Sequence, residues 1–171
     1  MVHVKRLVTT AVLFVLAVPG GAAAAPGQTT VERFPVDFVI SSASCPNLSE
    51  GASIEGSGTM HSVTRTKERA GITTVANSST ATGSATDQDG NRYRFVYKNR
   101  FSVSNSEAEP GLFSGVMHDL FLLRGSGPET LKNGFVAVFT TNFADVNMFD
   151  PISSFGDPID FATGEARCDP L

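Results

Sequence analysis

The chain has 171 residues, and its 13 lysines and arginines are outnumbered by 17 aspartates and glutamates, which gives a formal net charge of −4. This acidic balance argues against nucleic acid and anionic membranes as main partners, because both repel a negatively charged protein. The length suits one domain with a sizeable core, preceded by a short leader.

The first 25 residues have the three-part pattern of a secretory signal peptide. Lys5 and Arg6 form a short basic start, an apolar run follows over residues 7–18, and alanines occupy positions 22–25. The apolar run is shorter than the roughly 20 residues that a spanning helix needs. We therefore expect residues 1–25 to be cleaved, and residues 26–171 to form a single secreted, extracellular domain without a membrane anchor.

Two cysteines remain after the leader, Cys45 and Cys168. An even pair of cysteines in an oxidising compartment indicates a disulfide. The sequence has no Cys-x-x-Cys spacing and no histidine cluster of the kind that redox and metal sites use. We expect one disulfide that encloses most of the domain, with no metal and no cofactor.

Alternation of apolar and polar residues with period two dominates the remaining chain, and turn residues separate the alternating stretches. Gly56 and Gly58 suggest a bulge or a sharp coil in the second strand. Residues 145–160 contain two prolines and a glycine, and we expect an irregular apolar loop there. The expected strands are residues 32–42, 53–66, 72–86, 92–103, 113–124, 135–144 and 161–168.

Successive hairpins favour a meander topology. Because free edge strands promote aggregation, we expect this all-β meander to close into an antiparallel barrel of seven or eight strands, with a two-layer β-sandwich as the alternative. The expected disulfide favours the barrel, since it would tie the end of the first strand to the last strand. Those two strands are neighbours in a closed meander.

Several segments resemble a group of uncharacterised small secreted actinobacterial proteins. The similar segments are residues 34–38, 50–51, 56–61 and 82–86, together with the terminal Cys168. In that group an early cysteine pairs with one at the C-terminus around a predicted antiparallel barrel, lipocalin-like in shape. The resemblance implies location and fold but no activity, and residues 145–160 depart from the pattern.

The fourth expected strand has two different faces. Its odd positions are aromatic or apolar except at Asn99, and its even positions carry Arg92, Arg94, Lys98 and Arg100. This pattern is typical of a half-buried antiparallel strand. The cationic row could bind an acidic glycan or phosphate, unless acidic side chains on the neighbouring strands neutralise it.

Catalytic signals in the sequence are weak. His61 and His118 are the only histidines after the leader. His118 cannot pair with Asp119, because adjacent strand residues point to opposite faces. The two histidines remain the acid–base candidates of an alternative function, a secreted isomerase, cyclase or hydrolase with a site at the barrel mouth. Asp87 and its neighbours predict a hairpin turn rather than a calcium loop.

We expect a non-enzymatic binding protein that holds a small apolar molecule inside the barrel or at its mouth. A structural or cell-surface interaction module is the remaining alternative. The sequence predicts no oligomeric state and does not decide between a hollow and a packed interior. The expected ligand contacts are Tyr93, Phe95, Tyr97, Phe121, Phe135, Phe139, Met148 and Phe149.

Overall fold

The computed structural model describes residues 27–157, 159–160 and 165–168. The expected signal peptide and residues 161–164 of the expected last strand lie outside the described residues. Within the described part of the chain all regular structure is β-strand. No helix there has the length and hydropathy of a membrane-spanning segment.

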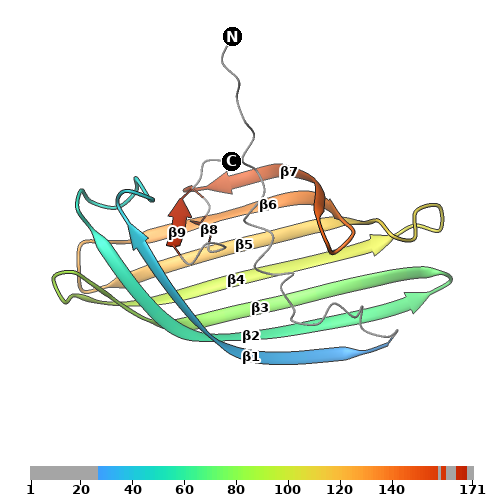
Figure 1. Cartoon of the computed structure of the whole chain (residues 1–171), viewed down its shortest axis with the longest axis horizontal. Coiled ribbons are helices and arrows are strands. Elements are labelled where there is room, and N and C mark those ends of the chain that lie inside the picture. The colour runs from blue at the N-terminus through green and yellow to red at the C-terminus, as the bar shows by residue number, and fades with distance from the viewer. Residues whose placement is uncertain (1–26, 158, 161–164, 169–171) are drawn as a thin grey trace, which may run out of the picture.

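The strands form one sheet, in which β1 to β7 run as an antiparallel meander (Figure 1). Each of these strands pairs with its neighbour in the chain, and β9 adds to β1 in a parallel pairing. The predicted all-β antiparallel meander is confirmed, but its seventh strand is residues 146–155 and not the expected residues 161–168. The strands are β1 (Thr29–Ser41), β2 (Ser53–Arg69), β3 (Ile72–Asp87), β4 (Arg92–Asn105), β5 (Phe113–Gly125), β6 (Leu131–Thr141), β7 (Val146–Phe155), β8 (Ile159–Asp160) and β9 (Glu165–Cys168).

The sheet is open but strongly coiled. Its order is β7-β6-β5-β4-β3-β2-β1-β9-β8, and no ladder joins the two outermost strands among the described residues, so barrel closure is not confirmed. Side chains nevertheless meet across the coil. The ring centroids of Phe38 in β1 and Phe121 in β5 are 5.8 Å apart. The backbone N–H of Ser49, in the loop after β1, donates to Glu129 Oε2 in the loop before β6 at 3.3 Å.

The segment predicted as an irregular loop, residues 145–160, contains an edge strand instead. Residues 146–155 form β7, which pairs with β6 through two register shifts. Val146 and Phe149 pack against the core, although both are only partly buried. Pro151 is compatible with this position because an edge strand needs only part of its N–H groups for pairing. Pro151 therefore marks a sheet edge rather than a loop.

Glycines in β2 and β3 allow the sheet to coil where β1 crosses over β4 and β5. A Cβ atom at Gly56 would collide with the ring of Phe38, and one at Gly58 or Gly83 would collide with the ring of Phe95. The β1–β2 register runs through Gly56 and Gly58 without a shift. These glycines therefore mark a sharp coil and not a bulge.

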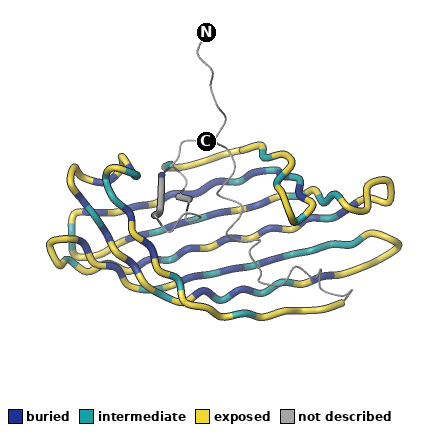
Figure 2. Tube along the Cα trace, in the orientation of Figure 1, coloured by how far each residue is buried: buried dark blue, intermediate teal, exposed yellow. Residues whose placement is uncertain are grey.

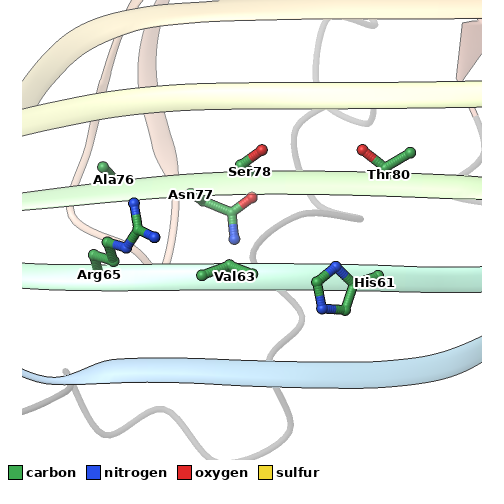
Figure 3. A pocket seen from close by; sticks show the side chains of 7 residues that line it. All are labelled: His61, Val63, Arg65, Ala76, Asn77, Ser78 and Thr80. Carbon is green, nitrogen blue, oxygen red and sulfur yellow. The ribbon is translucent and has the colours of Figure 1, made fainter.

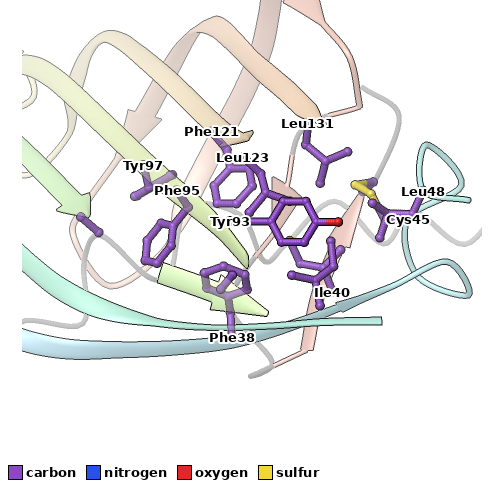
Figure 4. Close-up of a cluster of buried hydrophobic side chains, with 14 of the residues drawn as sticks. Phe38, Ile40, Cys45, Leu48, Tyr93, Phe95, Tyr97, Phe121, Leu123 and Leu131 are labelled. Carbon is purple, nitrogen blue, oxygen red and sulfur yellow. A yellow bond between two sulfur atoms is a disulfide. The ribbon is translucent and has the colours of Figure 1, made fainter. Parts of the chain in front are cut away.

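One face of the sheet, the inner face, is buried, and the opposite outer face is exposed (Figure 2). The inner face carries the even-numbered residues of β1 and β2 and the odd-numbered residues of β3 to β6. Its apolar side chains form two clusters. The first cluster joins β1 to β5 and includes Phe38, Tyr93, Phe95, Tyr97 and Phe121 (Figure 4). The second cluster joins β4 to β6 and comprises Phe101, Val103, Met117, Phe135, Ala137 and Phe139.

The predicted disulfide between Cys45 and Cys168 is confirmed, with the two Cα atoms 4.5 Å apart. Both cysteines belong to the first cluster and are buried. The backbone N–H of Cys168 also donates to the carbonyl of Ser44 at 2.9 Å. The bond fixes β9 beside the end of β1, and a buried disulfide is compatible with an extracellular protein.

Candidate functional site

A row of polar side chains crosses the inner face between the two apolar clusters. Ser62, Ser79, Asn99 and Asp119 lie directly opposite one another on β2, β3, β4 and β5. All four are buried, and Asn99 is only 1% exposed. We call these four residues the inner polar row. Polar groups lose water when they are buried, so each of these side chains needs a hydrogen-bond partner.

The β4–β5 half of the row surrounds a carboxyl group. The hydroxyl of Tyr97 donates to Asp119 Oδ2 at 2.7 Å, and Asn99 Nδ2 donates to the same oxygen at 2.9 Å. Alternation places Tyr97 and Asn99 on the same face of β4, and the β4–β5 register places Asp119 opposite Asn99. Phe121 follows Asp119 on the inner face of β5, so the carboxyl group lies beside an aromatic wall.

Burial raises the pKa of Asp119 to about 6, although the hydrogen bonds from Asn99 and Tyr97 act in the opposite direction. Loss of water disfavours the charged form of a carboxyl group more than two donors favour it here. Asp119 therefore populates both its neutral and its ionised form near pH 6. A carboxyl group with such a pKa can take up or release a proton under mild conditions.

Asn99 has a buried atom without a partner. Among the described residues no donor hydrogen-bonds to Asn99 Oδ1. Leaving a buried acceptor unpaired costs about 1–3 kcal/mol, so such groups in a folded protein call for an explanation. Asn133 Oδ1 is likewise unpaired; Asn133 lies near the start of β6, opposite Phe121, and its side-chain NH2 group donates to the carbonyl of Asp157.

The β2–β3 half of the inner polar row satisfies itself. Ser79 Oγ lies 2.9 Å from Ser62 Oγ and 2.8 Å from Asn77 Oδ1. The amide of Asn77 donates to Ser62 Oγ at 3.0 Å and to Thr64 Oγ1 at 2.9 Å. Asn77 thus forms hydrogen bonds through both Nδ2 and Oδ1, whereas Asn99 forms them only through Nδ2. Within the inner polar row, Asn99 alone has a fully buried side-chain oxygen without a partner.

The predicted ligand contacts lie on both sides of this row, with one exception. Tyr93, Phe95, Tyr97 and Phe121 belong to the first cluster. Phe135 and Phe139 belong to the second cluster, and Phe149 packs against it. Met148 is 41% exposed and pairs with Thr140, which places it on the outer face. The structure therefore brings seven of the eight residues to the inner face.

The two histidines lie on the outer face and do not meet. His61 in β2 lines an open groove of about 320 Å³ together with Arg65, Ser78 and Thr80 (Figure 3). His118 is exposed on β5, opposite Arg100. Three strand spacings separate β2 from β5, which is about 14 Å. The expectation that His118 and Asp119 point to opposite faces is confirmed, since His118 is exposed and Asp119 is buried.

The turn between β3 and β4 uses Asp87 as an acceptor for several donors, as predicted for a hairpin. Asp87 Oδ1 accepts from the backbone N–H groups of Asp89 and Asn91, and Oδ2 accepts from the Asn91 amide and the Tyr93 hydroxyl. Burial alone would raise the pKa of Asp87, but these hydrogen bonds outweigh it, so the pKa lies below its usual value. The carboxylate thus stabilises the turn itself.

The sequence did not reveal Asn99 and Asp119 as a pair. Each residue is polar at a position where the alternation of its own strand predicts an apolar residue. This interruption was the one signal in the sequence that could have identified them as site residues. Their contact depends on the β4–β5 register, which follows from the loop between the strands. The inner polar row must be interpreted from its own geometry, because no protein-family model matches this chain and no characterised protein or solved structure shows significant similarity to it.

Proposed function

We propose that this protein is a secreted, non-enzymatic binding protein that holds a small, largely apolar molecule against the inner face of its coiled sheet. The molecule would carry one hydrogen-bond donor, an O–H or N–H group, directed at Asn99. The observation that carries this proposal is the unpaired Asn99 Oδ1, buried between two aromatic clusters.

The chemistry of the surroundings supports an apolar ligand with a single polar group. Tyr97 and Phe121 lie on one side of Asn99, and Phe101 lies two residues further along β4 on the other side. Aromatic side chains provide large apolar contact areas. A donor on the ligand would pair with Asn99 Oδ1 and would remove the cost of about 1–3 kcal/mol that the unpaired oxygen imposes.

The first half of β1 offers a route to this site. Glu32 continues the inner polar row on β1, opposite Ser62, and is only half-buried. Phe34 lies on the inner face but is 38% exposed. Strand β9 pairs with β1 only at Val39 and Ile40, so the first half of β1 has β2 as its one partner strand among the described residues. A ligand could enter over this edge without breaking a ladder.

Native mass spectrometry of the protein purified from culture medium tests the proposal. The wild-type protein should carry a small-molecule mass excess that disappears on unfolding. An Asn99→Leu variant should lose this excess, because it removes the acceptor from an otherwise apolar wall. Thr80→Ala, a change on the opposite, outer face, should retain it. Circular dichroism confirms that each variant is folded.

Two results would contradict the proposal. One is a wild-type protein with only the mass of its chain that also fails to enhance the fluorescence of the apolar dye Nile red. The other is a mass excess that Asn99→Leu and Thr80→Ala retain equally. Either result would leave the inner face as a packed core, with the binding function of the protein on its surface.

Proton-transfer chemistry is a second candidate, and the pKa of Asp119 favours it. A carboxyl group with a pKa of about 6, hydrogen-bonded to a tyrosine hydroxyl, is suited to acid–base catalysis of an isomerisation or cyclisation. If the retained molecule changes chemically on incubation with wild-type protein and not with Asp119→Asn, the protein is an enzyme. If the molecule is unchanged in both samples, the protein binds it without catalysing a reaction.

A further inference from the structure

The outer face of the sheet is strongly cationic. Every lysine and arginine of strands β1 to β6 lies on this face and is exposed, whereas the acidic residues of the same strands divide between the faces. Only Asp37 and Glu55 share the outer face with the cations. The cations are Arg33, Arg65, Lys67, Arg69, Arg92, Arg94, Lys98, Arg100, Arg124 and Lys132.

Neighbouring strands do not neutralise this charge. On β3 the cations of β4 face hydroxyl side chains, since Ser84 lies opposite Arg94 and Ser78 lies opposite Arg100. On β5, Arg124 lies directly opposite Arg94, Leu120 lies opposite Lys98 and His118 lies opposite Arg100, so none of these partners is acidic. Within the described part of the chain, none of these cations forms an ion pair with a carboxylate. Like charges at opposite positions destabilise a sheet, so this arrangement does not serve stability.

The cationic row lies beside a row of hydroxyl groups. The outer face of β3 carries Thr74, Ser78, Thr80, Thr82, Ser84 and Thr86. The groove at His61 and Arg65 opens along the same strand and is lined by Ser78 and Thr80 (Figure 3). Arg92 and Arg100 mark the ends of the row on β4, about 27 Å apart at the usual rise of an extended strand. The surface thus presents charge and hydroxyls to an extended ligand.

The residue types on this face favour one class of anionic polymer. The outer face of β2 to β5 carries no Phe, Tyr or Trp, and its two imidazoles, His61 and His118, lie three strands apart, so the face lacks the continuous stacking platform that single-stranded nucleic acids use. Its exposed large apolar side chains, Ile72 and Val116, lie on different strands, and the face carries no Trp or Phe of the kind that anchors a protein in a bilayer. Hydroxyl side chains next to guanidinium groups match a polymer that carries both hydroxyls and acidic groups.

We propose that the outer face of β2 to β5 binds an acidic polysaccharide, which lies along the cation row of β4 and the hydroxyl row of β3. Arg94, Lys98, Arg100 and Arg124 contact its carboxylates, because guanidinium and ammonium groups form charge-assisted hydrogen bonds with such groups. This site lies on the opposite side of the sheet from the inner polar row, so it does not depend on the small-molecule function.

Fluorescence anisotropy with labelled oligogalacturonate, a carboxylated sugar polymer, tests this site. The wild-type protein should bind the probe at low salt, and added NaCl should weaken the binding. The double variant Arg94→Gln/Arg124→Gln should bind about tenfold more weakly or worse, since it removes two charge-assisted contacts. The matched control is Arg33→Gln/Arg69→Gln, which makes the same change in net charge on β1 and at the end of β2, away from the row, and should keep the wild-type affinity.

The fold should survive the substitutions in the row. Because Arg94 opposes Arg124, their replacement by glutamine should leave the melting temperature unchanged or raise it. Weaker probe binding by a folded variant would therefore report a lost contact and not unfolding. A second pair, Lys98→Gln/Arg100→Gln, should weaken binding in the same way, which makes the result independent of a single variant.

Three further probes distinguish the classes of partner. Dextran, a neutral glucan, should not compete with oligogalacturonate, whereas unlabelled oligogalacturonate should. Oligothymidylate and phosphatidylglycerol vesicles should bind more weakly than the sugar acid. The proposal is wrong if the wild-type protein does not bind oligogalacturonate at low salt, if the control pair weakens binding as much as the row variants, or if nucleic acid or vesicles bind more tightly.

Discussion

Removal of the Asp119 charge should change how the stability of the protein depends on pH. The pKa of Asp119 is about 6 in the folded protein and 3.8 in the reference state without burial. Between these two values the folded state binds more protons than the unfolded state, so the free energy of unfolding falls as the pH rises. The contribution of Asp119 is complete below about pH 4 and is lost as the pH passes through about 6.

The size of the effect follows from the shift in pKa. A change of about two units corresponds to about 3 kcal/mol between pH 4 and pH 7.5. The Asp119→Asn variant stays neutral at every pH, and its amide oxygen can still accept hydrogen bonds from Tyr97 and Asn99. The wild-type protein should therefore lose about 3 kcal/mol more than the variant over this range.

Urea unfolding at a series of pH values, with the disulfide intact, measures this difference. All other titrating groups are common to both proteins, so they cancel when one curve is subtracted from the other. Asp150→Asn, an exposed change on β7, serves as the control and should follow the wild-type curve. Parallel curves for wild type and Asp119→Asn would refute the reasoning, because they would show that burial does not perturb this carboxyl group.

Three other substitutions test the remaining structural claims. Replacement of Cys45 and Cys168 by serine should lower the free energy of unfolding by about 5 kcal/mol in urea titrations, because the disulfide joins residues separated by 123 positions. An unchanged urea midpoint of unfolding would contradict this prediction. Gly56→Ala should cost about 1–3 kcal/mol in the same assay, because its Cβ would meet the ring of Phe38, and wild-type stability would show that the ring shifts freely. Asp87→Ala should lower the melting temperature at pH 6 more than at pH 2.5. A carboxyl group with a lowered pKa stabilises the folded protein above about pH 4 and loses that effect on acidification. Equal changes in melting temperature at both pH values would argue against the hydrogen bonds to a charged Asp87.

Local patterns in the sequence predicted most of the sheet. The alternation of aromatic and cationic residues in β4 identified both its buried and its exposed face, and it did so because the side-chain period of a strand is two. Turn chemistry at Asp87 located the hairpin between β3 and β4. The pairing of Cys45 with Cys168 followed from their number and from the expected oxidising compartment.

The features that depend on relations between strands were missed. Strand β7 was hidden because Pro151 and two register shifts interrupt its alternation. The contact of Asn99 with Asp119 depends on strand register, which a single strand does not encode. The coil of the sheet depends on how the rings of Phe38 and Phe95 lie over glycines of other strands. Each of these features needs the positions of two or more strands at once.

The position of β9 beside β1 sets an order of assembly. Hairpins from β1 to β7 join consecutive strands, so each can form as soon as its two strands have been synthesised. The disulfide between Cys45 and Cys168 can form only after nearly the whole chain has been synthesised, because the two cysteines are 123 residues apart. A chain that ends a few residues early would possess every hairpin of the meander and would lack its covalent closure.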